Sequence, residues 1–207
     1  MHQPKIKMIF ACTQEGNVFG NADKLPWSQH IKKDMELFKL FTNESVLIMG
    51  HKTYESLPCN LRNLPHLVVT TETDKNKVFN KKKENPDFVF KTLEDATING
   101  VTMAEQLTQL YNMKPDVCII GGTGILLEAS HFVDEAMITE VVFRDKEKRY
   151  YDCPIYVDLE GIVEGLSTNS FISFEDTKLL KYNVPEGEIE RLEIRHYQSI
   201  DGDSKKY

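Results

Sequence analysis

Hydrophobic and polar residues repeat with a helical period in the stretch LPWSQHIKKDMELFKLFT, residues 25–42. Ser28 is a candidate N-cap, and residues 29–41 contain neither glycine nor proline, so the stretch predicts a helix. Successive side chains on a helix are about 100° apart. One arc then faces water and holds Lys32, Lys33, Glu36 and Lys39. The opposite, mostly apolar arc holds Ile31, Met35, Leu37, Phe38, Phe41 and Thr42, with Asp34 between the two phenylalanines.

The position of Asp34 is unusual because a buried carboxylate is costly unless it has a partner. Two ordinary explanations are an acid that interacts with the helix dipole and a rim residue turned to solvent. The dipole effect fades after the first turn, and Asp34 lies beyond the first turn of a helix capped at Ser28. The functional explanation is a ligand that brings its own N–H donors, such as a flat aminopyrimidine bound to both carboxylate oxygens. Desolvation would raise the pKa of such an acid, which could then help to supply protons near neutral pH.

Short apolar runs elsewhere predict strands, at residues 5–13, 45–49, 66–70, 88–90, 116–120, 136–143, 178–183 and 191–197. Helical patterns cover residues 93–96, 102–113 and 125–129, with a break at Asn99-Gly100. Residues 15–23 and 71–87 are predicted to be loops, the second of them solvated around three consecutive lysines. Strands alternating with helices indicate an α/β domain with a largely parallel sheet. Its ligands would bind beyond the strand ends at Thr13, Met49, Thr70 and Ile120.

Two glycine-containing turns follow predicted strands. Residues 121–124 read Gly-Gly-Thr-Gly, where bare backbone N–H groups favour phosphate oxygens. Residues 50–53 read Gly-His-Lys-Thr and add basic groups and a hydroxyl. Each turn alone is equally typical of an ordinary strand-to-helix connection. Together, at one sheet edge, they predict an elongated ligand with several phosphates.

Composition narrows the function classes. The 207 residues are 41% hydrophobic and 28% charged, which predicts one globular domain over residues 1–207 with a polar tail at 201–207. A net charge of −7 argues against a nucleic-acid partner. The four cysteines and six histidines have no metal-ligand spacing, so no metal is expected. No signal-like or membrane-length apolar run is present, which predicts a cytoplasmic protein without a membrane partner.

These motifs, in this order, resemble dihydrofolate reductases. The resemblance rests on Ile9-x-Ala11, Gly20, Leu25-Pro26-Trp27, Asp34-x-x-x-Phe38, Met49-Gly50-x-Lys52-Thr53-x-x-Ser56-Leu57, Ile120-Gly121-Gly122 and Thr139. It implies a fold with a central, mostly parallel, twisted sheet, an antiparallel C-terminal strand and flanking helices. It also implies an enzyme that reduces 7,8-dihydrofolate to tetrahydrofolate with NADPH, by hydride transfer to C6 and protonation at N5. The expected oligomeric state is a monomer, with an oligomer left open.

The resemblance assigns expected roles position by position. Asp34, with Trp27 and Thr139, would form the catalytic group. The substrate would contact Ile9, Ala11, Met35, Phe38, Leu57, Leu61, Arg62 and Ile120. NADPH would contact Ala11, Phe19, Gly20, Leu25, Gly50, His51, Lys52, Thr53, Thr70, Thr71, Gly121, Gly122, Thr123, Gly124 and Ile125. The family also has a cis Gly–Gly bond, which predicts a cis bond between Gly121 and Gly122.

The chain departs from the family pattern in several places. Leu64 stands where the family places the arginine that grips the folate glutamate, and Arg62 is the nearby substitute. Glu72 is an unfavourable neighbour for a 2′-phosphate. Extra residues at 73–86, 97–115 and 161–188 have no assigned role. Two alternative functions stay open: a pterin or pyrimidine reductase of the riboflavin type, and a non-catalytic folate- or nucleotide-binding subunit.

Overall fold

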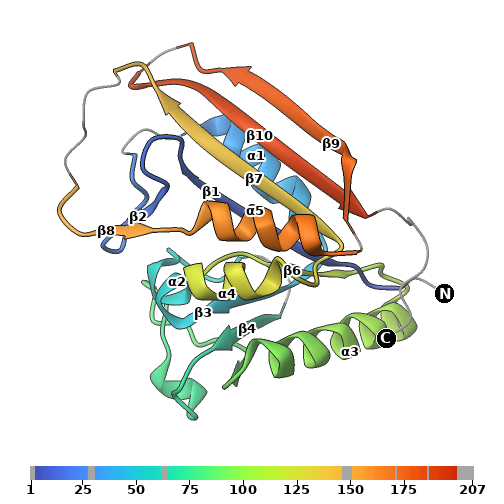
Figure 1. The fold of residues 1–207 in the computed structure, drawn as a ribbon. Coiled ribbons are helices and arrows are strands. Elements are labelled where there is room, and N and C mark those ends of the chain that lie inside the picture. The colour runs from blue at the N-terminus through green and yellow to red at the C-terminus, as the bar shows by residue number, and fades with distance from the viewer. Residues whose placement is uncertain are drawn as a thin grey trace.

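An eight-stranded sheet forms the centre of the computed structural model, which describes residues 3–27, 31–61, 65–145, 151–170, 172–185 and 187–199 (Figure 1). The strand order is β5-β4-β3-β6-β1-β7-β10-β9. The strands of this sheet are β1 (Ile6–Thr13), β3 (Ser45–Gly50), β4 (His66–Val69), β5 (Phe88–Phe90), β6 (Asp116–Ile119), β7 (Glu135–Phe143), β9 (Ile172–Asn183) and β10 (Ile189–Ser199).

Strand directions confirm the predicted α/β fold class. The six strands from β5 to β7 are parallel to their neighbours, whereas β10 is antiparallel to both β7 and β9. All eight predicted strands form within two residues of their expected ends, except that β9 begins at Ile172. Parallel strands end at one edge of the sheet, so the segments after β1, β3 and β6 are brought together there.

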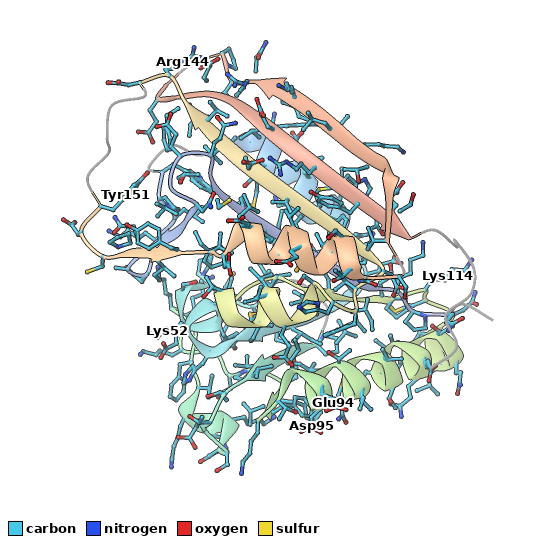
Figure 2. The ribbon with its side chains drawn as sticks, viewed as in Figure 1. Lys52, Glu94, Asp95, Lys114, Arg144 and Tyr151 are labelled. Carbon is cyan, nitrogen blue, oxygen red and sulfur yellow. The ribbon has the colours of Figure 1, made fainter. Side chains whose placement is uncertain are left out.

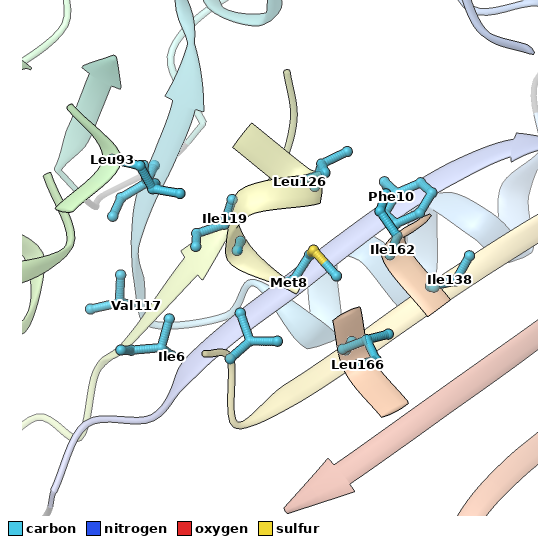
Figure 3. Packing of buried hydrophobic residues seen from close by; sticks show 14 of the residues in the cluster. Ile6, Met8, Phe10, Leu93, Val117, Ile119, Leu126, Ile138, Ile162 and Leu166 are labelled. Atoms are coloured by element: carbon cyan, nitrogen blue, oxygen red, sulfur yellow. The ribbon is translucent and has the colours of Figure 1, made fainter. Parts of the chain in front are cut away.

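Helices cover both faces of the sheet. They are α1 (Lys32–Phe41), α2 (His51–Ser56), α3 (Leu93–Tyr111), α4 (Thr123–Ala129) and α5 (Leu159–Thr168), with a 3-10 turn, η1 (Lys75–Lys77). Side chains of β1 alternate between two hydrophobic clusters. Met8 and Phe10 pack with α3, α4 and α5 (Figure 3), whereas Ile9 packs with α1 on the opposite face. In the part of the chain that the structure describes, no helix is long and apolar enough to cross a membrane.

Helix α3 is continuous, and the predicted break at Asn99-Gly100 is wrong. Gly100 lies inside the helix where it crosses the sheet. A Cβ atom at this position would lie 3.3 Å from Val117 Cγ1 and 3.5 Å from Ile48 Cδ1. The glycine therefore allows the helix to approach β6 and β3 closely, and this packing offsets its low helix propensity.

The predicted loop at residues 15–23 contains a strand, β2 (Val18–Asn21), which pairs with β8 (Pro154–Tyr156) in a second, two-stranded sheet. Local sequence does not predict this pairing, because the partner strand lies more than 130 residues away. The predicted loop at 71–87 is also more ordered than its composition indicates. Val78 is fully buried and Asn80 is 2% exposed, although the three lysines at 81–83 are exposed.

Candidate active site

Asp34 lies on α1 and faces the sheet. Its helix begins at Lys32, after Ile31 in an extended conformation that provides no side-chain cap. The predicted start at residue 29 is therefore wrong, and the proposed cap, Ser28, lies outside the described residues. Asp34 is consequently in the first helical turn, contrary to the argument made from the sequence. The distribution of the other side chains agrees with prediction, since Ile31 and Phe41 are buried.

Burial dominates the ionisation of Asp34. The half-buried carboxylate accepts a hydrogen bond from the Thr139 hydroxyl, which lowers its pKa, but desolvation raises the pKa from 3.8 to about 6. A position in the first turn also favours the charged form. The net increase in the pKa shows that removal of water outweighs the hydrogen bond from Thr139. The group therefore exists in both protonation states close to neutral pH.

The surroundings of Asp34 are apolar. Thr139 is 2% exposed on β7 and pairs in register with Ala11 on β1. Trp27 is 6% exposed and belongs to the same hydrophobic cluster as most of the predicted substrate contacts. These are Ile9, Ala11, Phe38, Leu57, Leu61 and Ile120. Met35 is half-buried on α1, and Arg62 lies outside the described residues.

The two glycine turns pack directly against each other. The Gly50 N–H donates a hydrogen bond to the Gly121 carbonyl, 3.0 Å away. Gly121 and Gly122 have φ values of +155° and +97°, which side chains disfavour. A Cβ atom on Gly121 would also lie 3.0 Å from Thr53 Cγ2 and 3.3 Å from Phe19 Cζ. The described residues contain no cis peptide bond, so the predicted cis Gly121–Gly122 bond is wrong. The chain reverses here through the positive φ angles of two trans-linked glycines.

An open hollow of about 450 Å³ lies between these turns. Its lining includes most of the residues predicted to hold phosphates: Gly50, His51, Lys52, Thr53, Gly122, Thr123, Gly124 and Ile125. Figure 2 shows Lys52 projecting from α2 at this side of the molecule. The exposed acid Glu128 also lines the hollow, which sequence reasoning missed because nothing in the pattern of α4 singles it out.

The remaining predicted cofactor residues do not line the hollow. Thr70 Oγ1 lies 3.0 Å from His51 Nδ1, so the ends of β3 and β4 are linked by side chains. Thr71 is exposed beside them. Phe19 and Gly20 lie on β2, with the Phe19 ring in edge contact with Phe10 at 6.4 Å. Leu25 is 51% exposed at the end of the same segment.

A parallel α/β sheet with two glycine turns at one edge and a half-buried acid facing an apolar cluster is typical of a ligand-binding α/β enzyme. The sequence model of the dihydrofolate reductase family matches residues 5–151, and the chain belongs to that family. The chain catalyses the NADPH-dependent reduction of dihydrofolate, and the function predicted from the sequence is confirmed.

Individual relatives agree with this assignment. The chain is 30% identical to dihydrofolate reductase type 8 of Escherichia coli, over 80% of this chain and 87% of the relative. It is 30% identical to the dihydrofolate reductase of Mycoplasma genitalium, over 84% and 94%. A match to type A10 of Escherichia coli, at 32% identity, spans 60% of this chain and 59% of that protein.

A solved structure shares the fold. Dihydrofolate reductase from Enterococcus faecalis, complexed with NADP(H) and RAB-propyl, superposes with a TM-score of 0.60 at 21% identity. The superposition covers 97% of this chain and 99% of the other. The two chains therefore share the fold over nearly all of the aligned residues.

Proposed function

We propose that Asp34 binds the pterin ring of 7,8-dihydrofolate and assists protonation at N5. The observation that carries this proposal is a half-buried carboxylate with a pKa of about 6, hydrogen-bonded by Thr139 and facing an apolar cluster. Its two oxygens suit the paired N–H donors of a ring nitrogen and its 2-amino group. Trp27, buried in the same cluster, holds a water beside the carboxylate.

The apolar side chains around Asp34 form the substrate walls. Ile9, Ala11, Met35, Phe38, Leu57, Leu61 and Ile120 enclose the pterin and the aminobenzoyl ring and exclude bulk water. Arg62 binds the glutamate carboxylate of the substrate. It takes over the role of the family arginine, whose position is occupied here by Leu64. A dry, flat pocket aligns the ring for reaction and strengthens the interaction with Asp34.

The residues at the glycine turns fit NADPH. The missing side chains at Gly50, Gly121 and Gly122 let the two turns pack against each other beside the hollow. The backbone N–H groups of the second turn, which continues through Thr123, Gly124 and Ile125, suit a pyrophosphate. His51, Lys52, Thr53, Thr70 and Thr71 hold the adenosine-side phosphates. Ala11, Phe19, Gly20 and Leu25 cover the nicotinamide. When bound, NADPH supplies the hydride for C6 of the pterin.

The substitution Asp34→Asn tests the assignment. An amide cannot act as the proton source and binds the aminopyrimidine less well, so hydride transfer near neutral pH falls by about 100-fold or more. NADPH affinity stays unchanged because the glycine turns are intact. Activity is followed by the loss of NADPH absorbance on addition of dihydrofolate, and cofactor binding by fluorescence titration.

Glu36→Gln is the matched control, since Glu36 lies on the exposed face of the same helix and pairs only weakly with Lys33, at 3.8 Å. It removes one carboxylate from α1 without touching the pocket. Full activity in both variants would refute the role of Asp34. Loss in both would indicate a general defect of the helix.

The two alternatives predict different results in the same assay. Reductases of the riboflavin type lack a pair such as Trp27 and Asp34. A protein with that function would not reduce dihydrofolate. A non-catalytic subunit would bind an antifolate, seen as a thermal shift, without oxidising NADPH. The family match supports the reductase over both. We further propose a monomer in a reducing, cytoplasmic setting, which the four free cysteines support.

A further inference from the structure

One wall of the proposed substrate pocket is a loop without regular secondary structure. It contains Leu57 and Leu61, which pack against the apolar cluster beneath α1. Such a loop cannot hold its own shape through a helix or sheet ladder, so its backbone groups need other partners. The position of this wall therefore depends on residues outside it.

Those partners come mainly from residues 78–84, which we call the anchor segment and which lie within the stretch 73–86 that has no assigned role. The Lys81 N–H donates to the Leu57 carbonyl at 3.0 Å. The Asn60 N–H donates to Glu84 Oε2 at 2.6 Å. Beyond the anchor segment, the Leu61 N–H donates to His66 Nε2 at 3.0 Å. The loop is thus held at three successive points along residues 57–61.

Asn80 is the centre of the anchor segment and is 2% exposed. Its Nδ2 donates to Asn60 Oδ1 at 3.0 Å and to Glu84 Oε2 at 2.7 Å. Its Oδ1 accepts from the backbone N–H groups of Lys82 and Glu84. Both donors and both lone pairs of the carboxamide are therefore used, which defines a single orientation.

The network continues into the body of the protein. The Tyr54 hydroxyl lies 2.8 Å from Asn60 Oδ1 and 3.0 Å from the Glu84 carbonyl, and Tyr54 is fully buried. The Asn60 N–H holds the pKa of the Glu84 carboxyl below its ordinary value, so this acceptor stays charged. On the other side, Lys81 Nζ donates to the Asp23 carbonyl at 3.0 Å and lies 3.1 Å from Asp23 Oδ2. The anchor segment is thus fixed to two neighbouring parts of the fold.

We infer that Asn80 is a positioning residue for dihydrofolate binding. Through Asn60 and Glu84 it holds the Leu57–Leu61 wall at the distance that the substrate requires, without contacting the substrate itself. This inference rests on the proposed substrate role of Leu57 and Leu61, and it assigns a function to the extra residues at 73–86.

The test compares Asn80→Ala with Asn76→Ala. Asn76 belongs to η1, just before the anchor segment, and its side chain donates locally, to Asp74 Oδ1 at 3.0 Å. Asn80→Ala is expected to raise the KM for dihydrofolate about tenfold, the factor expected for the loss of one to two hydrogen bonds. The kcat and the KM for NADPH stay within about twofold of wild type on this basis. Asn76→Ala leaves all three values unchanged.

Direct binding provides a second readout. The chain has one tryptophan, Trp27, beside the proposed pocket, so its fluorescence reports dihydrofolate binding without turnover. The dissociation constant should rise by the same factor as KM. Asn60→Ala should raise the dissociation constant for dihydrofolate in the same way. The double variant should bind dihydrofolate as well as the weaker-binding single variant does, because both changes break the same Asn80–Asn60 hydrogen bond.

Glu84→Ala provides an independent test if the Asn80 variant fails to fold. Glu84 is exposed, so its loss should not disturb folding, but its carboxylate accepts hydrogen bonds from both asparagines. It should also raise the KM for dihydrofolate about tenfold, because it removes the two hydrogen bonds that the carboxylate accepts from Asn60 and Asn80. Equal losses for both substrates, a fall in kcat alone, or multiplicative effects in the double variant would overturn the inference. Inactive wild-type protein would instead refute the proposed function, whereas active wild type with an unchanged Asn80→Ala variant would refute only the positioning role.

Discussion

Protonation of Asp34 links stability to pH. Its pKa in the folded protein, about 6, lies above its ordinary value of 3.8, so folding strengthens proton binding. The resulting stabilisation is fully present below about pH 4 and is lost as the pH rises through about 6. This sign is opposite to that of a salt-bridged aspartate, because desolvation rather than an opposite charge causes the shift. Burial of the Asp34 carboxylate therefore lowers the free energy of unfolding at neutral pH, and the same burial gives the group a pKa close to that pH.

The variant Asp34→Asn should consequently be more stable than wild type at neutral pH. A shift of about two pKa units corresponds to at most about 3 kcal/mol in the free energy of unfolding. The gain should disappear near pH 4, where the native carboxyl is also neutral. Urea unfolding at about pH 4 and about pH 7.5 measures the difference. A gain that is the same at both pH values would contradict the assigned ionisation.

At the scale of single elements, α3 shows how packing overrides a local signal. The sequence pattern predicted a break at Asn99-Gly100, but the glycine is buried between the helix and the sheet. By contrast, the predicted apolar arc of α1 is confirmed by buried Ile31 and Phe41 and by the packing of Leu37 and Phe38. A helix face is encoded by residue spacing, whereas a close helix–sheet contact depends on the opposing strand.

The substitution Gly100→Ala tests the packing of α3. Alanine gains helix propensity of about 1 kcal/mol, but its methyl group lies only 3.3 Å from Val117 Cγ1. Overpacking of a filled core costs about 1–3 kcal/mol, so a net destabilisation of about 1 kcal/mol is expected. The exposed neighbour provides the control: Asn99→Ala should change stability by no more than about 0.5 kcal/mol. Thermal unfolding that shows a more stable Gly100→Ala variant would contradict this account.

At the scale of the whole molecule, strand order assembles the site. The adjacent strands β3, β6, β1 and β7 bring together Gly50, Gly121, Ala11 and Thr139, which are far apart in sequence. Helix α1 then places Asp34 against Thr139 from the face opposite to α3, α4 and α5 (Figure 1). The two exposed sheet edges also limit self-association. β5 has three residues, and β9 carries exposed Lys178 and Lys181.

We therefore predict a monomer in solution. Leu179 and Leu180 on β9 are 54% and 38% exposed, but the flanking lysines repel a second copy of the same edge. Size-exclusion chromatography with light scattering should give the mass of one chain at micromolar concentration. Leu179→Lys should elute identically. A dimer that Leu179→Lys dissociates would show that this edge is an interface instead.

The sequence by itself determined the α/β class, the positions of nearly all sheet strands, the inward face of α1 and the two glycine turns. Each of these follows from residue spacing, which records the direction of side chains relative to their own helix or strand. Family motifs added the expected roles of Asp34 and Lys52, which stay proposals at the level of individual residues.

Tertiary structure decided what spacing cannot encode. It set the start of α1 at Lys32, paired β2 with the distant β8, kept α3 continuous through Gly100, and joined the two glycine turns by a hydrogen bond from Gly50 to Gly121. It also converted a lysine-rich loop into an ordered support for the substrate wall, because Asn80 finds partners at Asn60 and Glu84. The physical reason is the same throughout. Each of these features depends on a contact between two segments that are far apart in the sequence, and a local sequence pattern describes only one of those segments.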